Sequence, residues 1–361
     1  MKYIILIVLS SVFLFSDLFS QINLPQDHSL HSDYKIEWCY FVSILQLPND
    51  QKVGVELSFF RYQLNSNDKL NSGSPSLVKE IFPVHFAISD INNGKHYTSQ
   101  VMGRKIGGLS EYSDKVLKVH DFRMEILGDS KFRIFANPRF NQEIGIDLNL
   151  SGEKDNLFIH GVNGISKKSN LSPKFFSKYY SMTRLKTSGT VTLNGSKQEV
   201  LSGYTWMDHE WSQGDFNESN NSWDWVGLSL DDGSDWMAFR FKANQNAEAE
   251  TFGSTKWNQT TKTFEPNLDR NGIQDLQLVP NMELIWKSPV TGNVYPMEWR
   301  LTSITEKLDI IIKPYFKNQE FDGRKTTGLA YWEGAVTATG TRNGRIVNGQ
   351  GYLELKGYGK K

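Results

Sequence analysis

The chain has 361 residues, 39% of them hydrophobic, which is enough for two domains that each bury a core. Its 40 basic and 40 acidic residues balance, so it lacks the surplus of Lys and Arg that binding to nucleic acid requires. The single cysteine, Cys39, excludes an internal disulfide, and we interpret it as a small buried apolar residue.

Residues 1–20 have the pattern of a secretory signal peptide. Lys2 provides a positive start, residues 4–15 form an apolar run that is too short for a comfortable membrane span, and Ser20 offers a small residue for cleavage. Removal of this segment takes away one base and one acid, so the mature chain stays neutral. We therefore expect a secreted or periplasmic protein without a transmembrane helix in its mature chain.

The mature chain has the pattern of an all-β protein. Long helical periods are absent, and short alternating or aromatic runs recur between turn signals such as Asn194-Gly195 and Asn343-Gly344. We expect strands at residues 37–47, 53–64, 82–89, 96–102, 122–127, 132–136, 143–150, 157–162, 179–186, 189–193, 198–206, 223–230, 236–242, 250–257, 276–286, 294–302, 308–316, 328–339 and 351–358. This hairpin spacing predicts two tandem antiparallel β-barrels of about eight to ten strands each.

A polar stretch at residues 212–222 interrupts the series of strands and is suited to a linker or long loop. It divides the predicted mature chain into an N-terminal domain, residues 21–214, and a C-terminal domain, residues 215–361. Barrels of this size either fill their interior with side chains or hold one small apolar ligand.

The segment at residues 203–211 combines two acids and a histidine with two tryptophans. In an extended strand, alternation would put Trp206, Asp208 and Glu210 on one face, and Met207, His209 and Trp211 on the other. A buried charge without a partner is costly, so three consecutive ionisable residues need an explanation. Either the acids face solvent or pair with Arg or Lys at a domain junction, or they form an acid/base site at the mouth of an apolar cavity.

Tryptophans gather around this segment in the sequence pattern. The chain has ten of them, and the candidates for a wall beside the acids are Trp38, Trp206, Trp211, Trp223 and Trp225. Each one could equally pack in a core or close a barrel end. Their concentration near the acids favours a ligand site.

Several separated motifs resemble those of a known family. The segments at residues 31–38, 180–184, 203–211, 223–225, 331–334 and 351–358 resemble the AttH-like, carotenoid 1,2-hydratase-like (hydroxyneurosporene synthase-like) family. The resemblance implies an exported protein with two lipocalin-like (calycin) domains side by side. Some members are labelled predicted secreted hydrolases, and the family's chemistry includes hydration of an isolated double bond in carotenoids and pericyclic cyclisation. A His-x-Trp pair implicated in hydratase activity corresponds to His209 and Trp211, with Asp224 as the nearest downstream acid.

Hydration of an alkene needs a proton donor beside a dry pocket and a group that stabilises the carbocation. Asp208 or Asp224 could be the donor after burial raises its pKa, and His209 could position the water or relay the proton. The cation could lie against the faces of Trp206, Trp211 or Trp225. Glu210, Trp223 and Trp38 complete the predicted ligand site. This chemistry requires neither a metal nor an organic cofactor, and we predict none.

Two other kinds of catalytic site have weaker support. An Asp-His-Glu triplet could bind a metal, but the remaining histidines are scattered, and His28 and His31 stand three residues apart in a stretch without a helical pattern. Only His31, which the family motif places just before Glu37-Trp38, is a candidate among them. A Gly-x-Ser-x-Gly motif is absent from the sequence, so a serine hydrolase is not predicted.

A different class of function is transport. The predicted partner is a lipophilic small molecule, which a periplasmic carrier could hold without transforming it; peripheral contact with a membrane is left open. Asp208 and Glu210 would then pair with a strand arginine, Arg61, Arg184 or Arg240, and lock the domains together. A purely structural envelope protein would instead have barrels packed solid. The discriminating feature is whether Asp208, His209 or Asp224 lines a cavity.

Overall fold

The computed structural model describes residues 22–64, 79–105, 109–153, 156–170, 175–213, 222–242 and 248–359. The predicted signal peptide and the predicted domain boundary at residue 214 lie outside these residues. In this part of the chain, the single helix is the short 3-10 turn η1 (Gln26–His28). It contains no helix with the length and apolar character needed to span a membrane.

The first sheet has fourteen antiparallel strands from the N-terminal part of the chain. They are β1 (Ile36–Gln46), β2 (Lys52–Gln63), β3 (Glu80–Asp90), β4 (Lys95–Arg104), β5 (Ser110–Tyr112), β6 (Val116–Val119), β7 (Phe122–Gly128), β8 (Lys131–Ala136), β9 (Ile144–Ser151), β10 (Leu157–Ile159), β11 (Ile165–Lys167), β12 (Phe176–Leu193), β13 (Ser196–Glu199) and β14 (Ser202–Ser212). Their order is β4-β3-β2-β1-β14-β12-β9-β8-β7-β6-β5, with β10, β11 and β13 also paired to β12. Because β4 also contacts β6, the sheet curls into a nearly closed barrel.

The second sheet has ten antiparallel strands from the C-terminal part. They are β15 (Ser222–Leu230), β16 (Asp235–Lys242), β17 (Glu250–Trp257), β18 (Thr260–Phe264), β19 (Leu276–Pro280), β22 (Trp299–Ser303), β23 (Leu308–Pro314), β24 (Glu320–Gly323), β25 (Leu329–Arg342) and β26 (Arg345–Lys356). Their order is β18-β17-β16-β15-β26-β25-β23-β22-β19, with β24 paired to β25. Strands β20 (Ile285–Lys287) and β21 (Val294–Pro296) form a separate hairpin.

These sheets confirm the predicted all-β, antiparallel architecture. The number of strands is higher than predicted because three- and four-residue strands such as β5, β6 and β11 are too short to show alternation. Residues 179–186 and 189–193, expected as two strands, form the single long strand β12. Gly189 adopts a φ of 123° inside this strand, which a residue with a side chain would rarely adopt, so the glycine marks a bend rather than an end.

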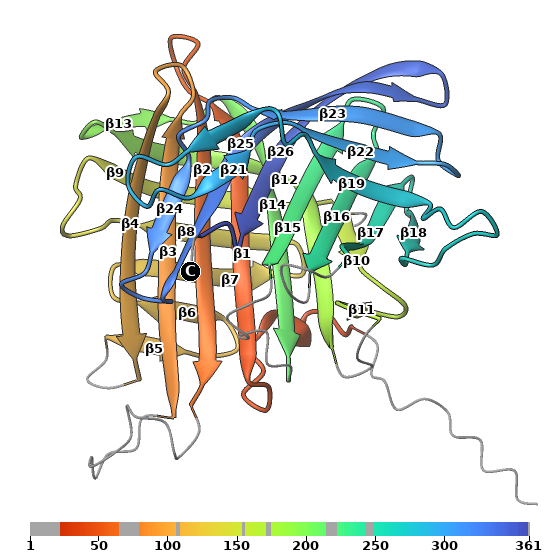
Figure 1. Ribbon diagram of the computed structural model, residues 1–361. Helices are drawn as coiled ribbons and strands as arrows, with labels where there is room; N and C mark the ends of the chain where they lie inside the picture. Colours follow the sequence, from red (N-terminus) through yellow and green to blue (C-terminus); the bar gives the residue numbers. More distant parts are fainter. Residues whose placement is uncertain are drawn as a thin grey trace, which may run out of the picture.

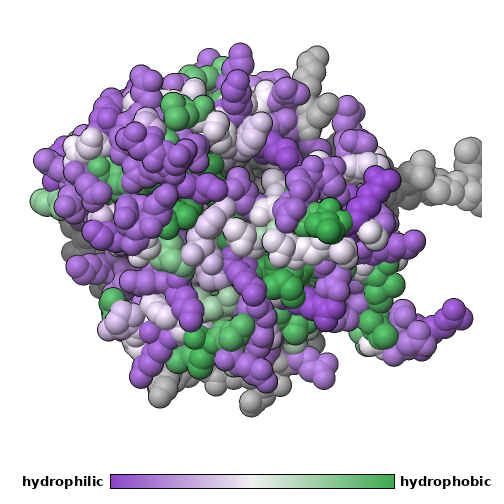
Figure 2. Space-filling model, turned by 90° about the horizontal axis from the view of Figure 1, so that it is seen from above, coloured by the Kyte–Doolittle hydropathy of each residue, from purple (hydrophilic) through white to green (hydrophobic). Residues whose placement is uncertain are grey.

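The two sheets pack against each other, so the central strands are buried on both faces (Figure 1). In β1, Cys39 and Phe41 point into the core of the first sheet, whereas Tyr40 and Val42 join a third cluster between the sheets. Cys39 is a fully buried free thiol, as predicted. The outer face seen in Figure 2 is mostly hydrophilic, with small separate hydrophobic patches.

A polar clamp ties the sheets together where β12 changes register. Arg184 has a φ of 53° at this irregularity and donates from Nε to Asp235 at 2.9 Å. Its Nη2 donates to the carbonyls of Leu230 and Ser234 at 2.9 and 3.0 Å. Thr183 donates to the same aspartate at 2.7 Å. Residues of the first sheet therefore satisfy backbone carbonyls of the β15–β16 turn.

Candidate active site between the sheets

A cavity of about 130 Å³ lies between the two sheets. Strands β1, β2, β3, β12 and β14 form one wall, and β15, β16, β25 and β26 form the other. Nine aromatic side chains line it: Trp38, Tyr40, Phe60, Tyr62, Tyr179, Trp223, Trp225, Phe239 and Tyr331. The ligand-sized space is therefore outside the interior of both sheets, which the hydrophobic cores fill.

Strand β14 contributes two acids to this cavity, and both lie on one face of the strand, as the alternation predicted. It pairs with β1 and β12 without interruption from residue 207 to 211, so successive side chains point to opposite faces. Asp208 and Glu210 line the cavity, and Trp206 belongs to the cluster between the sheets. Met207 and Trp211 pack in the core of the first sheet.

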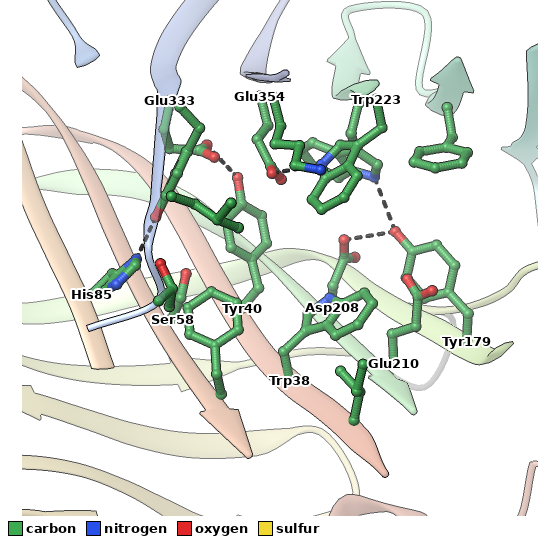
Figure 3. Close-up of a pocket in the computed structure, with 18 of the residues that line it drawn as sticks. Trp38, Tyr40, Ser58, His85, Tyr179, Asp208, Glu210, Trp223, Glu333 and Glu354 are labelled. Atoms are coloured by element: carbon green, nitrogen blue, oxygen red, sulfur yellow. Dashed lines mark hydrogen bonds between the residues drawn. The ribbon is translucent and has the colours of Figure 1, made fainter. Parts of the chain in front are cut away.

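Asp208 accepts three hydrogen bonds, of which Figure 3 shows the one from Tyr179. It is 3% exposed, and it accepts bonds from the Tyr179 hydroxyl at 2.6 Å, the Ser181 hydroxyl at 2.5 Å and the Trp206 indole at 2.6 Å. Burial raises the pKa of Asp208 to about 7, against the opposing effect of the three donors. Both protonation states are therefore accessible near neutral pH, as general acid–base catalysis requires.

Glu210 forms a buried ion pair at one side of the cavity. Its Oε1 lies 2.6 Å from Nζ of Lys168, and both side chains are 5% exposed. The ammonium also lies 4.9 Å from the ring centroids of Tyr179 and Phe239, within the range of a cation–π contact. Lys168 was not among the predicted site residues, because it stands outside the regular strands and no local pattern of residues marks it.

The second sheet contributes two more carboxyl groups, Glu333 and Glu354. Tyr40 donates to Glu333 at 2.6 Å across the sheet–sheet contact, and the Trp223 indole donates to Glu354 at 2.8 Å. Burial raises the pKa of Glu354 to about 7 and that of Glu333 well above its usual value. Neither acid was among the predicted site residues, although Glu333 alternates with the apolar Tyr331 and Ala335 on its face of β25.

His209 points to the opposite face of β14 and does not line the cavity. Fully buried, it contacts Glu37 through Nε2 at 2.8 Å and the Tyr180 hydroxyl through Nδ1 at 3.2 Å. Burial lowers its pKa. Trp211 lies beside it and stacks on His31, with ring centroids 3.9 Å apart and planes 9° apart. His209 and Trp211, the pair implicated by the family resemblance, therefore lie on the face of β14 that points away from the cavity.

His31, Glu37 and His209 form a group that could hold a metal ion, because their ligand atoms lie within 4.8 Å of one another. Both histidines already contact Oε1 of Glu37, at 2.7 and 2.8 Å. The guanidinium of Arg61 lies 3.6 Å from Oε2 of Glu37 and brings a positive charge beside the group. A hydrogen-bonded cluster around one carboxylate accounts for this geometry, and the neighbouring Arg disfavours a cation there.

The remaining predicted residues divide between the cavity and its surroundings. Trp38, Trp223 and Trp225 line the cavity. Asp224 is not among the lining residues: it pairs with Arg240 at 2.6 Å and accepts a bond from Tyr358 at 2.7 Å. Burial raises the pKa of Asp224 to about 6.

The arginines suggested as partners of the β14 acids contact other residues. Arg61 pairs with Glu80, Arg184 with Asp235, and Arg240 with Asp224. The interpretation of Asp208 and Glu210 as an arginine-based lock between domains is therefore wrong. An arginine does join the two sheets, but its partner is Asp235: Arg184 in β12 pairs with Asp235 in β16.

Ser181 has a histidine and an aspartate as neighbours without forming a nucleophile. Its hydroxyl donates to Asp208, so the Nε2–H of His160, 2.6 Å away, donates to the serine oxygen. Burial keeps the pKa of His160 well below its usual value, so the ring is neutral and its Nε2 carries a proton. His160 therefore does not accept the proton of Ser181, and the Ser–His contact is not that of an activated nucleophile.

Known proteins match this chain in family and in fold. A family model described as AttH-like matches residues 19–358. A candidate AttH protein from Nitrosomonas europaea has a structure with a TM-score of 0.81 and 28% identity, covering 94% of this chain and 98% of that one. Kievitone hydratase from Nectria haematococca has a TM-score of 0.70 and 15% identity, covering 95% of each chain.

CghA, solved with Sch210972, has a TM-score of 0.57 and 9% identity, covering 90% of this chain and 89% of its own. At such low identity, the likeness to kievitone hydratase and to CghA is a likeness of fold alone. No curated protein matches the sequence.

Proposed function

This chain belongs to the AttH-like family, as its motifs predicted, and on that premise we propose that it hydrates or cyclises a lipophilic alkene bound between its two sheets. One observation carries the proposal: carboxyl groups whose pKa values are raised toward or above neutrality line an aromatic cavity. Such groups remain protonated in part at neutral pH, and a protonated acid in a dry pocket is what alkene protonation needs.

The size of the cavity limits what reacts there. An apolar protein cavity of about 150 Å³ admits a molecule as large as benzene. The cavity between the sheets, at about 130 Å³, therefore fits one ring or one isoprene-sized group. A longer ligand would place only its reacting end between the sheets.

The proposed reaction begins with transfer of a proton from a cavity carboxyl group to one alkene carbon, which forms a C–H bond and leaves a carbocation. The faces of Trp38, Trp223 and Trp225 stabilise the cation by about 1 to 2 kcal/mol each when water is excluded. Water then forms the C–O bond and gives its excess proton to a carboxylate. Attack by a second double bond of the same molecule would instead form a C–C bond and move the positive charge to the new ring, which would then lose a proton to a carboxylate.

Two structural relatives support this choice of chemistry. Kievitone hydratase is named for a hydration, and CghA was solved with a small organic molecule, Sch210972. The same fold therefore accommodates both a hydratase and a protein that binds such a molecule. The alternative, a carrier that holds a lipophilic molecule unchanged, uses the same cavity.

The test begins with mass spectrometry of hydrophobic molecules that copurify with the protein. The ligand found is incubated with the wild type, with Asp208→Asn and with Asp309→Asn, a control in which an exposed ion pair with Arg300 is broken. We expect a product with the mass of one added water or an isomer of the ligand, and a rate on the order of 100-fold lower in Asp208→Asn. Recovery of the ligand unchanged by the wild type would favour the carrier and contradict the enzyme.

Export remains a separate proposal, based on the n-region and apolar run of residues 1–20. Its test is fractionation of cells that express the full chain, followed by N-terminal sequencing of the recovered protein. We expect a mature chain that begins near Gln21 in the periplasmic or secreted fraction. An intact Met1 on cytoplasmic protein would contradict export.

A further inference from the structure

Glu333 and Glu354 form a pair of facing acids in the cavity. They are direct partners in the antiparallel register of β25 and β26, and both line the cavity. Directly opposed side chains on one face of a sheet have Cβ atoms about 5 Å apart, and two like charges at that distance destabilise each other strongly where water is scarce. The pair is therefore most stable with at least one proton.

The neighbours of the pair decide where the proton lies. Glu354 accepts the indole N–H of Trp223, and the ammonium of Lys356 stands two residues along the same face of β26. Both contacts favour a carboxylate at Glu354, and Lys356 and Trp223 lower its pKa against the larger effect of burial.

Glu333 lacks a cation among its described contacts and is 2% exposed. It faces the first sheet, where Glu56 is a further buried acid whose Oε2 has no hydrogen-bond partner among the described residues. Burial, Glu354 and Glu56 together raise its pKa well above the usual value. Tyr40 donates to Oε1 of Glu333, and no described hydrogen bond involves Oε2, so the proton of the neutral acid is free to be donated from that oxygen.

Asp208 has the opposite environment on the facing sheet. Its three hydrogen-bond donors all stabilise the carboxylate. Tyr40 connects the two acids, because it is the register partner of Asp208 in β1 and β14 and donates to Glu333 in the other sheet. Two acids with opposed environments across one cavity are the usual arrangement of a general acid and a general base.

We propose that Glu333 is the proton donor of the cavity, that Glu354 stabilises the resulting cation, and that Asp208 accepts the proton released by the attacking water. The assignment rests on the proposed function and specifies its residues. In each turnover the O–H bond of Glu333 breaks as the C–H bond forms, and the water proton goes to Asp208. Return of that proton to Glu333 restores the starting state, so water is the only co-reactant.

A pH–rate profile distinguishes this assignment from the reverse one, in which Asp208 donates the proton and Glu333 accepts it. Glu333 must be protonated and Asp208 ionised, so we expect Glu333→Gln to lose the alkaline limb and Asp208→Asn to lose the acidic limb, each with a kcat on the order of 100-fold lower. The other ionisable groups that line the cavity are Tyr40, Tyr62, His85, Lys168, Tyr179, Glu210, Tyr331, Glu354 and Lys356, with Glu56 beside them. Glu298→Gln, which breaks an ion pair with Lys313 in the second sheet, is the matched control and should keep both limbs.

Infrared spectroscopy tests the protonation state without any turnover. At pH 7 we expect a carbonyl-stretch band of a protonated carboxyl group that Glu333→Gln removes and Glu298→Gln retains. Glutamine has the shape of the neutral acid. If Gln prevents folding, Glu333→Asp provides a second variant, which keeps an acid on a shorter side chain and should shift the band rather than remove it. A band that Glu333→Gln leaves unchanged, or that Glu333→Asp leaves at the wild-type position where Gln does not fold, overturns the assignment, as does loss of the alkaline limb in Asp208→Asn. A wild type that shows the band but no turnover would refute the proposed function alone.

Discussion

Replacement of Glu37 by Gln tests the hydrogen-bonded cluster behind β14. The carboxylate is fully buried and contacts His31, His209 and Arg61. Burial raises its pKa, but the hydrogen bonds and charges of the two histidines outweigh that effect and lower the pKa from 4.5 to about 2. A difference of about 2.5 units corresponds to about 3 kcal/mol of stability at neutral pH.

The sign of the pH dependence follows from the lowered pKa. The folded state binds the proton less readily than the unfolded state, so the stabilisation is complete above pH 4.5 and disappears as the pH falls through about 2. We therefore expect Glu37→Gln to lower the free energy of unfolding by about 3 kcal/mol at pH 7 and by about 1 kcal/mol at pH 3.

Urea denaturation followed by tryptophan fluorescence measures this difference at both pH values. Glu111→Gln is the control, because Glu111 is 57% exposed and its ion pair with Lys118 is 3.8 Å long, so its loss should cost less than about 1 kcal/mol. A loss in Glu37→Gln no larger than in the control, or one that is the same at pH 3 and pH 7, would refute the assignment of a stabilising buried charge.

Three further changes test the contact between the sheets. Arg184→Ala removes the bonds to Asp235 and to two backbone carbonyls, and should lower the free energy of unfolding by about 2 kcal/mol or more in urea denaturation. Gly54→Ala would place a Cβ 2.5 Å from the hydroxyl of the buried Tyr352 and should cost about 1 to 3 kcal/mol, measured as a lower Tm. Burial raises the pKa of Glu56 from 4.5 to about 8, so between these pH values the folded state binds a proton that the unfolded state releases. The stability that this proton provides is complete below pH 4.5 and is lost as the pH rises through 8. Glu56→Gln should therefore match the wild type near pH 5 and exceed its stability by about 4 kcal/mol at pH 9.

Matched variants distinguish these effects from nonspecific damage. Arg300→Ala breaks an exposed ion pair with Asp309 and should cost less than about 1 kcal/mol. Gly128→Ala would bring its Cβ only to 4.0 Å from Cβ of Lys131 and should leave the Tm nearly unchanged. Equal losses in test and control variants would contradict the importance of the sheet–sheet contact, and a Glu56→Gln variant with the wild-type pH dependence would contradict the buried acid.

The faces of β14 illustrate how much of the site could be predicted. Alternation is a local property of an extended chain, so the sequence correctly put Asp208 and Glu210 on the face opposite Met207 and Trp211. It also indicated the antiparallel β architecture, the burial of Cys39 and the family. Each of these depends on residues close together in the chain or on recognisable motifs.

Only the tertiary structure decided which face meets the ligand space. Because β14 is buried on both faces, its period of two could not say whether Asp208 or His209 looks into the cavity. Asp224 has an Arg240 partner in β16, whereas the cavity receives Glu333 and Glu354 from strands more than a hundred residues from β14 in the chain. Sheet packing brings these acids together, and the loss of water between the sheets raises their pKa values, an effect that no local pattern of residues encodes.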